Sequence, residues 1–138
     1  MHFFRSAILV FLLSWPCMAV SQSWERFLGH WEGRGHQDGE SWAMQLWIVS
    51  DAARVDYPEF PCGGVWVLDQ TGKDSVGIER LTYGTEFCWD ELLLKLAVLP
   101  DGRLQVSWHD GDEQIVAKAT LDRVVKTESS KAKSAGRK

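Results

Sequence analysis

Residues 92–121 read LLLKLAVLPDGRLQVSWHDGDEQIVAKATL, and apolar residues occupy every second position in three short runs of them. The apolar positions are Leu92, Leu94, Leu96 and Val98, then Leu104, Val106 and Trp108, then Ile115, Ala117, Ala119 and Leu121. A period of two residues is typical of strands with one buried face. The separators Pro100-Asp101-Gly102 and Asp110-Gly111-Asp112 are tight-turn sequences. We therefore predict an antiparallel meander, with strands at residues 87–99, 103–109 and 113–125.

The same alternation extends toward the N-terminus in five further runs. We place strands there at residues 30–37, 41–50, 54–57, 63–69 and 76–83. The one helical candidate is a short turn at residues 23–28. Short antiparallel strands joined by tight turns predict an all-β, up-and-down eight-stranded barrel, because closure removes the edge strands. A two-sheet sandwich shows the same alternation and stays open as the alternative.

The N-terminal segment has the layout of a secretory signal, which we assign to residues 1–21. Arg5 supplies a positive charge, residues 7–13 form an apolar run, and Pro16 breaks the chain before small residues. A buried N-terminal helix and a lipoprotein acylated at Cys17 are the alternatives. The apolar run is too short to span a membrane, so we expect a periplasmic or secreted protein.

Charge divides the rest of the chain into a single folded domain, residues 22–125, and a tail, residues 126–138. The domain holds nine Lys or Arg and eighteen Asp or Glu, a net charge of −9. This acidic balance argues against nucleic acid as a partner. The basic tail, KTESSKAKSAGRK, has no apolar residue larger than Ala, and we predict that it is disordered.

Two cysteines, Cys62 and Cys88, remain after removal of the signal. An even pair in an oxidising compartment predicts a disulfide, which would stabilise the fold by about 3 kcal/mol in the chain-entropy model. Two free buried thiols are the alternative. Because neither cysteine has a close His neighbour, we expect no metal site and no cofactor.

The sequence lacks the common catalytic motifs, with no Gly-x-Ser-x-Gly, phosphate loop or HExxH. Four carboxylates could supply the pair that a glycosidase needs, and we interpret most of them as acidic surface. They are Glu79, Glu86, Asp90 and Glu91. The ligand-rich segment from His109 to Asp112 is interpreted as a solvated turn. We therefore predict a protein without enzymatic activity.

Gly29-His30-Trp31 opens the first predicted strand and Leu121-Asp122-Arg123 closes the last. This pairing resembles the calycins, the group of lipocalins, avidins and fatty-acid-binding proteins. The resemblance implies that the indole of Trp31 closes one end of the barrel under the guanidinium of Arg123, both as structural residues. Calycin-type barrels include small periplasmic inhibitors of secreted metalloproteases, which resemble this chain in size, export and one disulfide.

Five short motifs mark the middle of the chain: Tyr57-Pro58, Cys62-Gly63-Gly64, Glu79-Arg80, Tyr83-Gly84 and Cys88. They resemble a family of small exported bacterial domains of mostly unassigned function. This second resemblance implies no chemistry.

Seven tryptophans remain after removal of the signal. Some of them form the core, and others are candidates for binding. Trp42 and Trp47 point to opposite faces of one predicted strand, so only one of them can face the barrel interior. The candidate binding residues are Tyr57, Phe60, Trp42, Trp108, Phe87, Trp89, Asp90 and Glu91.

These patterns predict an exported binding protein that holds a small apolar or aromatic ligand or a partner protein. The alternative is a periplasmic inhibitor or immunity protein against a secreted or cell-wall hydrolase, since an acidic protein suits a basic target. A small-ligand binder needs a cavity of roughly 300 Å³ or more. The many bulky side chains predict a mostly filled interior, which favours a protein partner.

Overall fold

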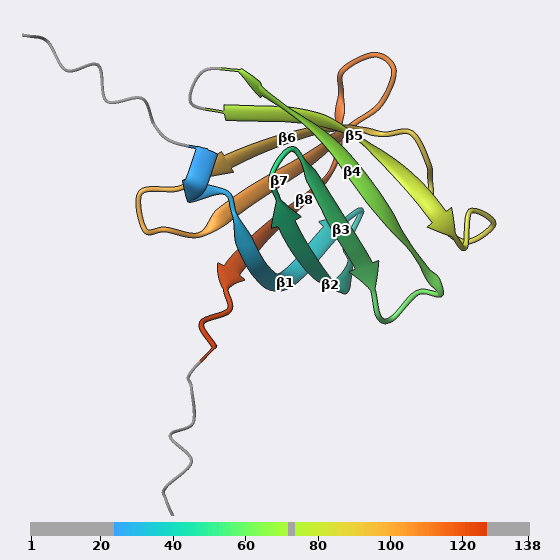
Figure 1. Cartoon of the computed structure of the whole chain (residues 1–138). Coiled ribbons are helices and arrows are strands. Elements are labelled where there is room, and N and C mark those ends of the chain that lie inside the picture. The colour runs from blue at the N-terminus through green and yellow to red at the C-terminus, as the bar shows by residue number, and fades with distance from the viewer. Residues whose placement is uncertain (1–23, 72–73, 127–138) are drawn as a thin grey trace, which may run out of the picture.

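A computed structural model describes residues 24–71 and 74–126. Within these residues a 3₁₀ turn, η1 (Trp24–Arg26), precedes eight strands. The strands are β1 (Gly29–Gln37), β2 (Glu40–Val49), β3 (Ala52–Tyr57), β4 (Cys62–Thr71), β5 (Asp74–Tyr83), β6 (Leu93–Val98), β7 (Leu104–His109) and β8 (Ile115–Arg123). Each strand pairs antiparallel with the next, and β8 pairs with β1 (Figure 1). The predicted closed barrel is confirmed, and the sandwich alternative is wrong.

Side-chain alternation directs one face of each strand into the barrel. In β2 the inward side chains are buried, at Trp42, Met44, Leu46 and Ile48. Trp47 lies on the outer face of the same strand and is half-buried. Its ring stacks on His30 at 4.7 Å, and the guanidinium of Arg54 lies 5.2 Å from its centroid. The predicted opposition of Trp42 and Trp47 is therefore confirmed.

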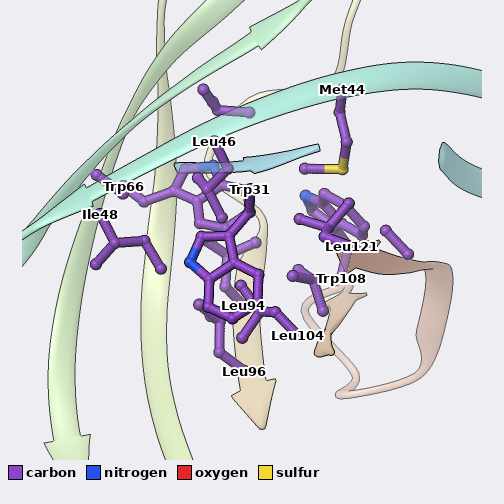
Figure 2. Packing of buried hydrophobic residues seen from close by; sticks show 14 of the residues in the cluster. Trp31, Met44, Leu46, Ile48, Trp66, Leu94, Leu96, Leu104, Trp108 and Leu121 are labelled. Atoms are coloured by element: carbon purple, nitrogen blue, oxygen red, sulfur yellow. The ribbon is translucent and has the colours of Figure 1, made fainter. Parts of the chain in front are cut away.

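The barrel has two different ends. At the closed end, which carries η1 and the end of β8, the interior is packed with apolar side chains (Figure 2). Trp31, Leu104 and Leu121 are at most 1% exposed there, and Leu96 and Leu94 of β6 continue this packing toward the opposite end. At the opposite end, the strands are joined by the β1–β2, β3–β4, β5–β6 and β7–β8 connections.

The predicted strand at residues 87–99 is about twice as long as the observed strand, because β6 covers only Leu93–Val98. The preceding residues form a loop in which the N–H groups of Phe87 and Cys88 both donate to the carbonyl of Gly84. The last strand begins at Ile115 rather than at 113, because Glu113 has a positive φ and belongs to the turn. The predicted helix at 23–28 is the shorter η1.

The predicted signal, residues 1–21, lies outside the described residues, and so does the predicted tail except for Lys126. In the part of the chain that the structure describes, no helix is long and apolar enough to cross a membrane.

Candidate functional site

A cavity of about 320 Å³ lies at the end of the barrel opposite η1. We call it the mouth cavity. Six aromatic side chains line it: Trp42, Tyr57, Phe60, Phe87, Trp89 and Trp108. The apolar side chains of Leu92, Val116 and Ala117 also line the cavity. Tyr57, Trp66 and Trp108 are buried beneath it, so the cavity is an opening at the end of a barrel whose interior is mostly filled.

All six aromatic residues among the predicted binding residues meet around this one cavity. Three are buried, namely Trp42, Tyr57 and Trp108. The other three are exposed by 43% at Phe60, 61% at Phe87 and 62% at Trp89, and we call them the aromatic rim. The site thus has a buried aromatic interior and an exposed aromatic entrance.

The buried rings form adjoining walls. Trp42 and Trp108 have centroids 6.3 Å apart at an interplanar angle of 64°. Trp42 and Phe60 are 6.4 Å apart at 57°. These tilted and edge-to-face contacts are arrangements that aromatic pairs prefer, so Trp42 is fixed by a ring on either side.

Two predicted binding residues, Asp90 and Glu91, do not line the cavity. The Asp90 carboxylate accepts hydrogen bonds from the N–H groups of Leu81 and Glu91, both at 2.8 Å. This carboxylate therefore holds the β5–β6 loop against β5. The side chain of Glu91 is 74% exposed and lies 4.0 Å from Arg80.

Glu79 of β5 lies at the inner end of the mouth cavity and is only 3% exposed. Its Oε2 accepts a hydrogen bond from the indole N–H of Trp66 at 2.7 Å. The hydroxyl of Tyr57 donates to the same oxygen. The site therefore contains a buried carboxylate held by two aromatic donors.

Burial raises the pKa of Glu79 above its ordinary value of 4.5. Hydrogen bonds from Tyr57, Trp66 and Trp108 act in the opposite direction, and the charge of Asp90 adds to the rise. Burial, followed by the charge of Glu79, raises the pKa of Tyr57 well above 10.0. Ionised Glu79 is therefore destabilised by its surroundings.

This raised pKa predicts a dependence of stability on pH. The folded state binds the Glu79 proton more tightly than the unfolded chain does, so the contribution is fully present below pH 4.5. It is lost as pH rises through the higher pKa of the folded state. We expect Glu79→Gln to remove this loss, since the amide oxygen still accepts from Tyr57 and Trp66. The raised pKa of Tyr57 lies above the pH range of this effect. Asp90 is present in both proteins, so its own titration does not distinguish them.

Urea unfolding of the wild type and Glu79→Gln between pH 4 and 8 measures the effect. The stability of the variant relative to the wild type should rise with pH. Glu91→Gln is the matched control, because it removes an exposed carboxylate and should leave the pH profile unchanged. Parallel profiles for Glu79→Gln and the wild type would contradict the prediction.

Of the four carboxylates interpreted mostly as acidic surface, Glu86, Asp90 and Glu91 are exposed, and Glu79 is the buried exception. The signal that could have found it is the parity of β5, whose inward positions are Ser75, Gly77, Glu79 and Leu81. The apolar side chain of Ile78 is instead 40% exposed on the outer face. Trp66 lies directly opposite Glu79 on β4, so the register brings the acid to its indole donor.

Cys62 and Cys88 form the predicted disulfide, with Cα atoms 6.4 Å apart. Cys62 begins β4 and is fully buried. Cys88 lies in the β5–β6 loop and lines the mouth cavity. The disulfide therefore ties the loop that carries Phe87 and Trp89 to the wall of the barrel.

The closed end contains the contact that the sequence resemblance implies. The guanidinium of Arg123 lies 4.1 Å from the ring centroid of Trp31. It donates to the carbonyls of Arg26 and Leu28, the first at 2.7 Å. Phe27, the residue directly after η1, is buried in the core cluster and so helps to close this end of the barrel.

His109 is buried rather than solvated. Its Nε2 lies 2.9 Å from the hydroxyl of Ser107, and its Nδ1 lies 3.1 Å from the carbonyl of Glu113. Both ring nitrogens therefore have polar partners in β7 and the β7–β8 turn. Among residues 24–71 and 74–126, no group of three or more His, Cys, Asp or Glu side chains could hold a metal ion.

No family model, curated protein or solved structure matches this chain. The class of the protein is therefore inferred from its fold and its cavity.

Proposed function

We propose that this chain is an exported, non-enzymatic binding protein that takes a small apolar or aromatic ligand into the mouth cavity. The observation that carries the proposal is this cavity of about 320 Å³ with its aromatic lining. Pockets that bind small molecules are typically about 300–1,000 Å³ and mostly apolar, with a few polar groups. Glu79 and Tyr57 are the polar groups here.

The proposal includes a calycin-like barrel and removal of residues 1–21 on export to the periplasm or outside the cell. The Trp31–Arg123 contact supports the first part. The disulfide supports the second, because disulfides persist mainly in oxidising compartments.

A neutral fluorescent probe, N-phenyl-1-naphthylamine, tests the proposed cavity. We expect its emission to rise on binding, with energy transfer from Trp42 and Trp108. Ala117→Leu adds apolar volume at the cavity wall and should weaken binding by about ten-fold. Ala52→Leu makes the same change at an exposed position of β3 and is the matched control. An absence of binding, or equal binding by both variants, would argue against a ligand cavity.

The aromatic rim favours a second candidate, a protein partner such as a secreted or cell-wall hydrolase. Phe87 and Trp89 are more than half exposed on a loop that a disulfide restrains. Exposed aromatic side chains are common at the centres of protein interfaces. The buried rings distinguish the two candidates, since a small ligand contacts Trp42 and Trp108 as well as the rim, whereas a protein contacts the rim alone.

A further inference from the structure

We propose that the ligand of the mouth cavity is a small organic cation, an ammonium group on an apolar or aromatic body, whose charge lies beside Glu79. This inference rests on the proposed function and specifies its ligand class. Three features of the cavity support it: the charge of its lining, its aromatic rings and a buried carboxylate without a positive partner.

The charge of the cavity selects against anions. Among the described residues that line it are three acids, Asp38, Glu40 and Glu79, and no Lys, Arg or His. Asp38 and Glu40 are exposed in the β1–β2 hairpin, and their negative charge raises the local concentration of cations at the entrance. A carboxylate or phosphate ligand would meet repulsion without a compensating base.

The ring faces favour a cation over a neutral ligand of the same shape. A cation over the face of Trp, Tyr or Phe is attracted by the negative potential of the ring, most strongly where water is excluded. Trp42, Trp108 and Phe60 all line the mouth cavity, so a cation bound there would lie close to three aromatic rings. Tyr57 adds a fourth ring beside Glu79.

The carboxylate of Glu79 lacks a positive partner in the part of the chain that the structure describes. None of the ion pairs there includes it. The groups that hydrogen-bond to it, Tyr57, Trp66 and Trp108, are all uncharged donors. Because a buried carboxylate without a cation is strongly destabilising, an ammonium group in the cavity would supply the missing charge.

Three ligands of matched shape test the inference by isothermal titration calorimetry. They are 2-phenylethylammonium, neutral 2-phenylethanol and anionic 3-phenylpropionate. We expect the cation to bind at least about ten-fold more tightly than the alcohol, and the anion to bind most weakly. Glu79→Gln should reduce the affinity for the cation to about that for the alcohol and should retain binding of the alcohol, because the amide oxygen still accepts a hydrogen bond from a hydroxyl.

Retained binding of the alcohol also shows that Glu79→Gln folds with its cavity intact. Glu91→Gln is the matched control, because it removes an equal charge from the same end of the barrel outside the cavity lining. If the alcohol binds and the cation binds no better, or if Glu79→Gln leaves the preference intact, the inference is wrong and the proposed function stands. If none of the three ligands binds, both are wrong.

Discussion

Replacing Trp31 with Ala is expected to lower the free energy of unfolding by about 3–5 kcal/mol, the usual loss for a buried aromatic side chain. Trp31 is completely buried, and its indole N–H donates to the carbonyl of Phe27 at 2.9 Å. Its ring lies under Arg123, which also donates to the backbone next to η1. The substitution therefore removes the packing that joins β1, β8 and η1 at the closed end.

Trp47→Ala is the matched control for this prediction. Like Trp31, Trp47 has a guanidinium near its face, which comes from Arg54. Its ring stacks on His30. It lies on the outer face of the barrel and is only half-buried, so its removal should cost about 1 kcal/mol. Urea unfolding followed by circular dichroism compares the two variants. Equal losses would show that closure of the barrel by Trp31 contributes nothing beyond an ordinary surface contact.

Much of the fold could be predicted because local patterns determine it. Alternation at β2 predicted that Trp42 and Trp47 lie on opposite faces, although both faces are apolar and it did not predict which one is inside. The Pro100-Asp101-Gly102 turn predicted the β6–β7 hairpin. The pairing of β1 with β8 has no local signature, since it joins Trp31 to Arg123 across the whole domain. The choice between barrel and sandwich therefore depended on the general cost of exposed edge strands.

The candidate site could be predicted only in part. Aromatic residues were recognisable by type, and the register of the barrel brings Trp42, Tyr57 and Trp108 to one end. Asp90 and Glu79 could not be told apart by type, because both are acids. Their positions separate them: Asp90 accepts from backbone N–H groups of the loop, whereas Glu79 has inward parity. Parity predicts a buried acid only when the strand's inward face is already known.

Replacing Gly84 with Ala is expected to lower the free energy of unfolding by about 2–5 kcal/mol. Gly84 has a φ of +72°, which costs an L-residue about 1–2 kcal/mol. A Cβ there would also meet the carbonyl oxygen of Pro61 and would lie 2.7 Å from the Cα of Cys62. Those backbone atoms cannot move independently, because Cys62 pairs with Tyr57 on β3 and is joined to Cys88. Overpacking of this kind costs about a further 1–3 kcal/mol.

Gly102→Ala separates the two contributions. Gly102 has a φ of +86° in the β6–β7 turn, and a Cβ there would meet no atom within 4 Å. Gly102→Ala should therefore lower the free energy of unfolding only by the backbone contribution of about 1–2 kcal/mol. The larger loss at Gly84, measured by urea unfolding of both variants, reports how tightly the β5–β6 loop is held against β4. Since that loop carries Phe87 and Trp89, Gly84→Ala should also weaken probe binding, whereas Gly102→Ala should not. Equal unfolding losses would mean that the loop can move away from Cys62 without cost, and that the aromatic rim is not fixed by the backbone.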